Sequence, residues 1–221
     1  MIITIDGPAG TGKSTVARRL AALLDMIYIN TGILYRTVAW ILWEKNLLPH
    51  PSSQELKSIF DHFDFHIHHE GESQTYFLNG EEISRVIFTP HISEVVSEIS
   101  ALKEVRDALT PFQLAYAQQG NSILEGRDLA TLFPWADYKF FLTAREEVRA
   151  ERRYREIQKQ WAEDRSPPSL EGIRNNLKKR DYIDSTRVHS PLTQTQDAIV
   201  VDTSDLSIDQ VVEIMQEYCK R

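Results

Sequence analysis

The stretch IITIDGPAGTGKS, residues 2–14, decides the fold. A short β-branched run, Ile2–Ile5, leads into the glycine-rich segment 7–14, which fits the pattern G-x4-G-K-[ST]. The residues that follow, to Leu24, carry apolar side chains at roughly 3.6-residue spacing and predict a helix. A strand, a glycine-rich loop and a helix in this order predict a phosphate-binding loop.

The chemistry of such a loop assigns a role to each part. Its glycines let successive backbone N–H groups turn inward, and the helix N-terminus adds positive potential for phosphate. We expect Lys13 to reach the β- and γ-phosphates of a nucleotide, and the Ser14 hydroxyl to ligate Mg²⁺. The predicted nucleotide-binding residues are Gly7, Pro8, Ala9, Gly10, Thr11, Gly12, Lys13, Ser14 and Thr15. The correct flanking elements disfavour a chance glycine-rich turn, but the loop alone does not separate a kinase from a GTPase or a motor.

Strand and helix patterns alternate through most of the chain and predict an α/β fold, with a parallel sheet flanked by helices. Further strands are expected at 27–29, 122–124, 138–142 and 198–201, and helices at 33–43, 92–118, 146–161 and 170–184, with a terminal helix opened by the capping box Ser207–Gln210. Period-two patterns around the Asn79-Gly80 turn predict a small antiparallel insertion at 63–84. We expect one domain, 1–221, with a core of about 1–36, 100–148 and 185–221, an insertion of about 37–99 and a lid of about 149–168.

The composition narrows the class of protein. Lys and Arg number 25 against 32 Asp and Glu, a net charge of −7, which argues against general nucleic-acid binding. No run approaches the roughly 20 apolar residues of a membrane span, and no secretion signal is recognisable, so we expect no membrane association. Cys219 is the only cysteine, which fits a reducing, cytoplasmic setting. We expect a monomer.

Arginines recur where a second phosphate would be bound. Arg36 and Arg127 follow predicted strands, and ligands of open α/β sheets bind beyond the carboxyl ends of strands. Arg149 and Arg153 share a helix face, and we interpret them as part of a lid that closes over ATP. For their neighbours Arg152 and Arg155, a solvated helix with ion pairs is an equal alternative. Arg180 and Asp184, four apart, would by themselves indicate only a local salt bridge.

Taken together, these segments resemble bacterial-type cytidylate kinases, which phosphorylate CMP and dCMP from ATP. The resemblance covers nearly the whole chain and rests on the phosphate loop with Ile5-Asp6 before it, Thr31-Gly32-Ile33-Leu34-Tyr35-Arg36, Val105-Arg106-Asp107-Ala108-Leu109, Glu125-Gly126-Arg127-Asp128, Arg180-Asp181 with Asp184 and Arg187, and the terminal segments 201–204 and 206–208. The Tyr-Arg, Gly-Arg-Asp and late Arg-Asp segments are much more specific than the loop.

The resemblance implies a role for each matching position. Thr31, Arg36 and Arg127 would hold the CMP phosphate, and Arg180 and Asp184 the sugar. The cytosine edge would be read by Ser97, Arg106 and Asp128, with Arg187 close by. Arg127, Arg149 and Arg153 would join Lys13 in catalysis. The ligands implied are ATP, CMP, dCMP and Mg²⁺.

Two positions depart from the family pattern, which often has Asp where this chain has Asn30 and Glu125. Asn30 keeps hydrogen bonding without charge, and Glu125 keeps the charge with a longer reach.

Two other functions remain open at this stage. One is a P-loop kinase for another small acceptor, such as a sugar, a shikimate-like acid or a coenzyme precursor. The other is a non-catalytic nucleotide-binding regulator, which would have little use for so many phosphate-facing arginines. For the cluster His62, His66, His68 and His69, the alternating pattern favours an exposed strand edge over a metal site.

Overall fold

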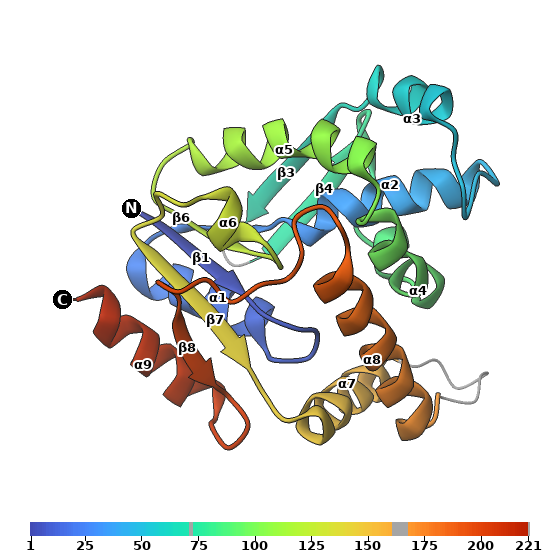
Figure 1. Cartoon of the computed structure of the whole chain (residues 1–221). Coiled ribbons are helices and arrows are strands. Elements are labelled where there is room, and N and C mark those ends of the chain that lie inside the picture. Colours follow the sequence, from blue (N-terminus) through green and yellow to red (C-terminus); the bar gives the residue numbers. More distant parts are fainter. Residues whose placement is uncertain (71–72, 161–167, 221) are drawn as a thin grey trace. The chain divides into compact units, whose positions relative to one another are not determined.

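The computed structural model describes residues 1–70, 73–160 and 168–220 (Figure 1). These residues form two compact units. Unit 1 comprises residues 1–29 and 120–221, and unit 2 comprises residues 30–119. The expected core, insertion and lid are defined by the ligand that each segment would bind, not by compactness. That division therefore stays a prediction.

A five-stranded sheet forms the centre of unit 1, in the order β2-β6-β1-β7-β8. Its strands are β1 (Ile2–Asp6), β2 (Ile27–Asn30), β6 (Ser122–Glu125), β7 (Tyr138–Thr143) and β8 (Ile199–Asp202). The pairs β1–β6, β1–β7 and β7–β8 are parallel, with Ile5 opposite both Glu125 and Phe140. The expected parallel sheet is thus confirmed. Because these strands run in one direction, Asp6, Glu125 and Thr143 come to the same edge.

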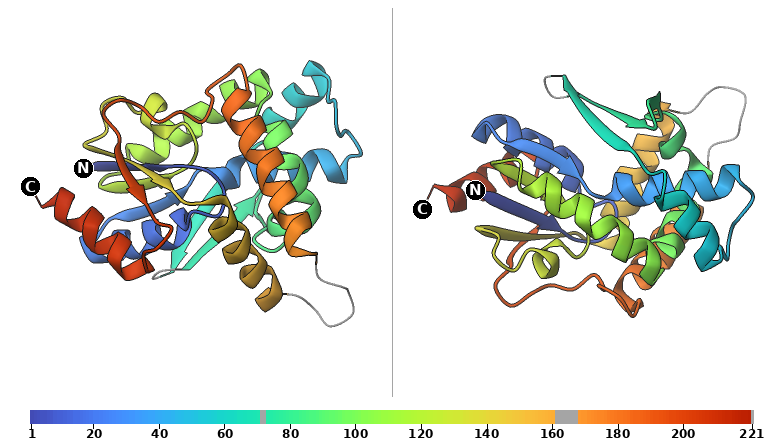
Figure 2. Two further views of the ribbon diagram at one scale, coloured as in Figure 1. Left: turned by 60° about the horizontal axis from the view of Figure 1, so that its bottom comes forward. Right: turned by 90° about the horizontal axis from the view of Figure 1, so that it is seen from above.

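Helices α1 (Lys13–Leu24), α6 (Leu129–Leu132) and α9 (Ile208–Cys219) pack against this sheet. Helices α7 (Glu146–Gln160) and α8 (Leu170–Thr186) instead share a small apolar cluster with Ala9 of the loop 7–14. Val16 and Leu20 of α1 and Met215 of α9 are completely buried with Ile3 and Phe140 of the sheet. The capping box at Ser207 and Gln210 opens α9 as expected. Helices α7 and α8 pack side by side, as Figure 2 shows.

Unit 2 has a core of its own. It contains α2 (Gly32–Glu44), α3 (Ser53–Phe60), β3 (Phe65–Glu70), β4 (Ser73–Leu78), β5 (Glu81–Glu82), a 3₁₀ turn at Val86–Phe88, α4 (Pro90–Ile99) and α5 (Lys103–Ala117). The strands form the expected small antiparallel sheet, β3-β4-β5. Its apolar side chains, among them Phe65 and Tyr76, are buried with Ile33 and Val38 of α2.

The helical patterning expected over 92–118 is confirmed, but it falls into two helices, because α4 ends at Ile99 and α5 begins at Lys103. At this break the Ser100 hydroxyl donates to the Ser97 carbonyl at 2.9 Å, and Arg106 donates to the Ser100 carbonyl at 3.0 Å. These bonds satisfy carbonyls that the end of a helix leaves open. Helix α3 was not expected, although Ser52 and Glu55 form a capping box at its start.

The histidines behave as the alternating pattern predicts. His66, His68 and His69 lie on β3 with exposed side chains, and Nε2 of His66 is 2.8 Å from Oδ1 of Asp64. Within the described ranges, no three His, Cys, Asp or Glu side chains are grouped as metal ligands.

Candidate active site

The phosphate loop of unit 1 has the backbone that its glycines permit. Gly7, Gly10 and Gly12 have positive φ angles of 141°, 80° and 90°. A Cβ atom on Gly7 would lie 2.0 Å from the Leu142 carbonyl oxygen, so the loop passes β7 too closely for any side chain. Within the loop, the Pro8 carbonyl accepts hydrogen bonds from Lys13 Nζ at 2.7 Å and from Thr11 Oγ1 at 3.1 Å.

Lys13 begins α1 and is buried beside charges of both signs. Burial and, next, the charge of Arg127 hold the pKa of its amine well below the ordinary range, whereas Glu125 and Asp6 act in the opposite direction. Burial also raises the pKa of the Glu125 carboxyl, opposed by Lys13 and by the hydrogen bond from Ser14. Lys13 and Glu125 are therefore buried next to the loop, where each favours the charged form of the other against the effect of burial.

Ser14 and Glu125 together have the chemistry of a magnesium site. The Ser14 hydroxyl donates to Oε1 of Glu125 at 2.8 Å, although the two residues are 111 positions apart. A hydroxyl and a carboxylate are the hard oxygen donors that Mg²⁺ accepts in nucleotide sites. The residues present thus fit this ion, and Glu125 joins Ser14 as a candidate ligand.

Asp6, at the end of β1, holds the segment that contains Arg127 and Asp128. Its two carboxylate oxygens accept hydrogen bonds from the backbone N–H groups of Leu129 at 3.0 Å and Ala130 at 2.7 Å. The residue is 1% exposed. Burial raises the pKa of Asp6 to about 6, and these two hydrogen bonds oppose the rise. Asp6 belongs to a motif that matched the family, but the sequence did not predict that it would hold the backbone of Leu129 and Ala130.

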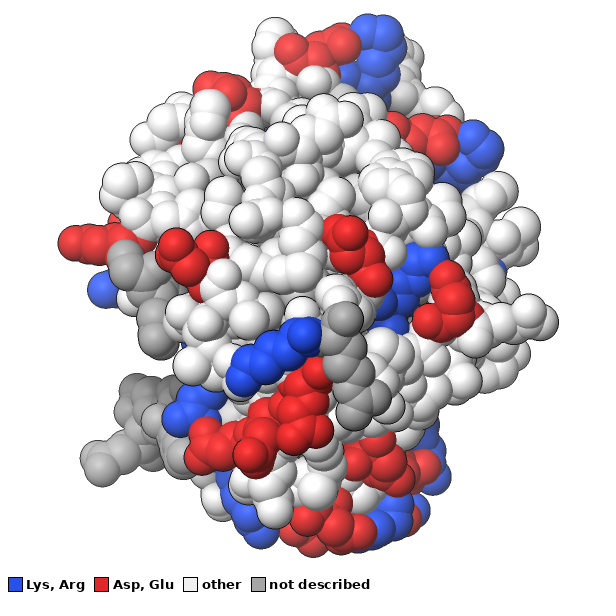
Figure 3. All heavy atoms as spheres, turned by 90° about the vertical axis from the view of Figure 1, so that its left-hand side faces the viewer, with Lys and Arg blue, Asp and Glu red and all other residues white. Residues whose placement is uncertain are grey.

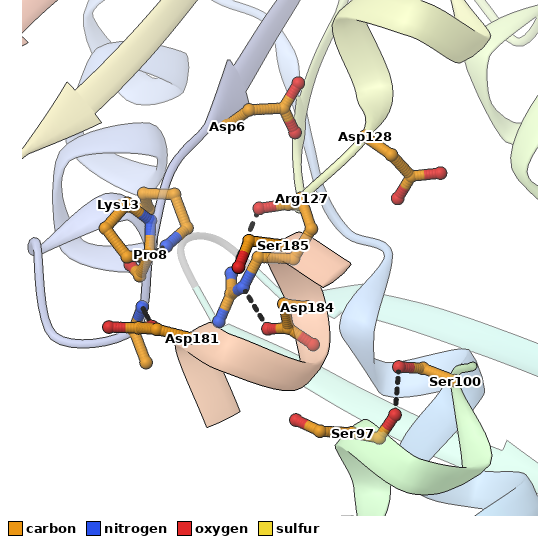
Figure 4. A network of polar contacts seen from close by, with 12 residues as sticks. Asp6, Pro8, Lys13, Ser97, Ser100, Arg127, Asp128, Asp181, Asp184 and Ser185 are labelled. Carbon is orange, nitrogen blue, oxygen red and sulfur yellow. Dashed lines mark hydrogen bonds and ion pairs between the residues drawn. The ribbon is translucent and has the colours of Figure 1, made fainter. Parts of the chain in front are cut away.

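Arg127, Asp128, Asp184 and Arg187 form one network of ion pairs. Arg127 Nε is 3.1 Å from Asp184 Oδ2, as drawn in Figure 4. Arg187 lies between two carboxylates, at 3.3 Å from Asp128 and 3.8 Å from Asp184. Asp184 and Arg187 are almost completely buried, and paired charges at such sites define the orientation of each side chain. The structure therefore joins four of the predicted substrate-binding residues through direct contacts.

Arg180 lies one helical turn before Asp184 on α8. Its Nε atom is buried, and it donates no hydrogen bond within the described protein. Burial, followed by the charge of Arg127, lowers the pKa of its guanidinium to about 10. A buried guanidinium with an open donor is suited to receive an anionic or hydroxyl-bearing ligand.

The arginines of α7 differ in their surroundings. Arg149 is buried against the phosphate loop, where Nη1 donates to the Ala9 carbonyl at 3.1 Å. Arg152 donates to Thr203, whose hydroxyl lies 3.1 Å from the Thr11 carbonyl. Arg153 pairs with Glu156 at 2.8 Å, and the exposed Arg155 with Glu151 at 3.3 Å. Of the predicted lid, residues 161–167 lie outside the described residues.

Unit 2 holds the remaining predicted residues. Arg36 donates from Nη1 to the Ile87 carbonyl and to Ser93 Oγ, each at 3.0 Å, and its guanidinium lies 5.4 Å from the Phe88 ring centroid. Arg106, 5% exposed, lies 5.3 Å from the Tyr35 ring centroid. Thr31 and Ser97 are buried. At the start of α2, Asn30 Oδ1 accepts from the Gly32 N–H at 3.0 Å, so this departure from the family pattern has a local structural use.

Comparison with known proteins assigns the family. A sequence model described as cytidylate kinase matches residues 3–221. The chain belongs to the cytidylate kinase family. The cytidylate kinase of Protochlamydia amoebophila is 43% identical over 219 residues, covering 99% of this chain and 96% of that protein. The cytidylate kinase of Carboxydothermus hydrogenoformans is 42% identical over 222 residues, covering 100% and 98%.

A solved structure shows the same fold outside the cytidylate kinase family. The shikimate kinase of Bacteroides thetaiotaomicron aligns with a TM-score of 0.50 over 100% of this chain and 99% of its own. The two sequences are 13% identical, so the likeness concerns the fold alone. The sequence-based expectations of the family and of a P-loop kinase fold are both confirmed.

Proposed function

We propose that this chain transfers the γ-phosphate of ATP to CMP or dCMP, giving ADP and CDP or dCDP. The observation that carries the proposal is the family match over residues 3–221 in a chain that has a complete phosphate loop. Catalysis then depends on positioning and electrostatics, with in-line transfer and no covalent enzyme intermediate.

On the donor side, the phosphate loop binds ATP and Lys13 contacts its β- and γ-phosphates. Lys13 now donates to the Pro8 carbonyl, so its amine already lies within the loop. Ser14 and Glu125 hold Mg²⁺, which when bound offsets negative charge on the phosphates. Arg149 and Arg153 contribute positive charge from α7 during transfer.

On the acceptor side, Thr31, Arg36 and Arg127 bind the CMP phosphate, while Arg180 and Asp184 bind the sugar. The fixed ion pair between Arg127 and Asp184 supports this assignment, because it orients a planar donor group before the ligand arrives.

Ser97, Arg106, Asp128 and Arg187 recognise cytosine. A carboxylate accepts from the cytosine amine, and arginines donate to its ring acceptors. Uracil has the opposite donor and acceptor pattern at two of these positions, so it leaves polar groups unpaired, at about 1–3 kcal/mol each.

We further propose a cytoplasmic monomer that binds neither membranes nor nucleic acid. None of the helices in the described part of the chain is long and apolar enough to cross a membrane. Acidic and basic side chains are interspersed on the face in Figure 3, and the net charge of −7 disfavours binding to polyanions.

A coupled assay tests the function directly. Production of ADP is measured with ATP, Mg²⁺ and, in separate reactions, CMP, dCMP, UMP, AMP and shikimate. We expect turnover with CMP and dCMP well above that with every other acceptor. Preference for another acceptor, or no turnover by folded protein, would refute the proposal.

A further inference from the structure

Asp181, near the end of α8, contacts two groups that the proposed function assigns to ATP. Its Oδ1 accepts a hydrogen bond from the Ala9 N–H of the phosphate loop at 3.2 Å. Its Oδ2 pairs with Nη1 of Arg149 on α7. Figure 4 shows Asp181 next to Pro8 and Lys13 of the loop. The motif Arg180-Asp181 matches the family, but the resemblance implies a role for Arg180 only and none for Asp181.

Arg149 on α7 contacts both Asp181 and the phosphate loop. Nη1 of Arg149 donates to the Ala9 carbonyl at 3.1 Å, and Nε donates to the Ala144 carbonyl at 3.2 Å. A Cβ atom on Gly10 would lie 3.0 Å from both the Cβ and the carbonyl oxygen of Arg149, so the missing side chain lets α7 approach the loop. We call Asp181, Arg149 and the Ala9 peptide groups the Asp181 clasp.

The charges in the clasp have opposing effects on a nucleotide. The side chains of Arg149 and Asp181 are only 11% and 21% exposed, so the pair is poorly screened by solvent. The Asp181 carboxylate accepts the hydrogen bond of the Ala9 N–H group, which belongs to an anion-binding loop. Its negative charge also raises the pKa of the Lys13 amine. A negative charge at this place weakens ground-state binding of polyphosphate by repulsion. A charge that weakens nucleotide binding is useful to a kinase only if it speeds a step that follows binding.

We propose that Asp181 is a positioning residue that holds Arg149 against the phosphate loop for phosphoryl transfer, although its charge weakens binding of the nucleotide. This inference rests on the proposed catalytic role of Arg149. A merely structural link between α7, α8 and the loop predicts something different, since its loss would weaken nucleotide binding and turnover together.

The substitution Asp181→Asn separates the two effects. The remaining carbonyl oxygen of Asn still accepts from the Ala9 N–H, while the charge pair with Arg149 is lost. We expect kcat with CMP to fall at least about tenfold, and the dissociation constant of ADP, measured by calorimetry without acceptor, to stay equal or decrease severalfold. Glu171→Gln, the same change of charge at an exposed position on α8, serves as the control and should alter neither quantity.

Two further variants complete the test. In an Arg149→Met background, Asp181→Asn should have little additional effect on kcat, because the residue through which Asp181 acts is gone. Asp181→Glu keeps the charge and should recover part of the lost turnover. An unchanged kcat in Asp181→Asn, equal losses in both backgrounds, or weaker ADP binding together with lower turnover would overturn the inference. Absence of CMP turnover in the wild type would refute the proposed function instead, and the ADP measurement would still report on the clasp.

Discussion

At the scale of single residues, Lys13 is the most direct test of the donor site. Its amine is buried within the phosphate loop, so Lys13→Ala removes the positive charge where negative charge develops during transfer. We expect kcat at saturating ATP to fall about 100-fold or more, on the order of 3 kcal/mol of transition-state stabilisation. Lys57→Ala, at an exposed position on α3, should keep normal turnover. Near-normal turnover in folded Lys13→Ala protein would contradict the assignment.

Asp6 gives a prediction about stability and pH. Burial raises its pKa from 3.8 to about 6, so the folded chain binds this proton more tightly than the unfolded chain does. Stability therefore falls as the pH rises through this window, by about 3 kcal/mol from this residue. Asp6→Asn stays neutral and lacks the effect. In urea denaturation, the free energy of unfolding of the wild type should fall relative to Asp6→Asn between pH 4 and 6 and level off above. If the difference in unfolding free energy between the wild type and Asp6→Asn does not vary with pH, the raised pKa of Asp6 is disproved.

Contacts of individual residues were predictable where they are local. The phosphate loop could be predicted because its eight residues, 7–14, are consecutive and its glycines permit the turn. The contact of Asp181 with Ala9 spans 172 positions, and that of Asp6 with Leu129 spans 123. Such contacts depend on how strand ends and helices pack, which periodicity does not specify.

At the scale of elements, α7 is the part of unit 1 expected to respond to ligands. It contacts the loop through Arg149 and carries Arg153, and the predicted lid extends from it to residue 168. We expect amide hydrogen exchange in peptides within 149–168 to slow when ADP and CMP bind together. Exchange that stays the same, with binding confirmed by calorimetry, would indicate a static solvated helix.

The helix boundaries show what a pattern of apolar residues leaves out. The apolar spacing predicted helical structure from 92 to 118 but did not show the break between α4 and α5, where Ser100 and Arg106 satisfy the carbonyls. The capping box of α3 could have been recognised, since Ser52 and Glu55 have the same spacing as Ser207 and Gln210.

At the scale of the whole molecule, the order of strands and helices predicted the fold class, and the Tyr-Arg, Gly-Arg-Asp and late Arg-Asp segments indicated the family. Alternating patterns predicted the parallel sheet, and the turn at Asn79-Gly80 predicted the small antiparallel sheet. The network around Asp184 was expected only as a set of ligand-binding residues. Its direct ion pairs follow from packing α8 beside the end of β6, which requires three-dimensional information.

The central claim is that this kinase reads cytosine, and the pair Arg106→Met and Arg36→Met tests it most directly. Arg106 is proposed to contact the base and Arg36 the phosphate, which all nucleoside monophosphates share. We predict that Arg106→Met narrows the ratio of kcat/KM for CMP over UMP by roughly tenfold, about 1.4 kcal/mol. Arg36→Met should lower both values and leave the ratio nearly unchanged. Because the fraction of active enzyme cancels in this ratio, partial misfolding does not affect it. Equal losses for CMP and UMP in Arg106→Met would contradict the claim.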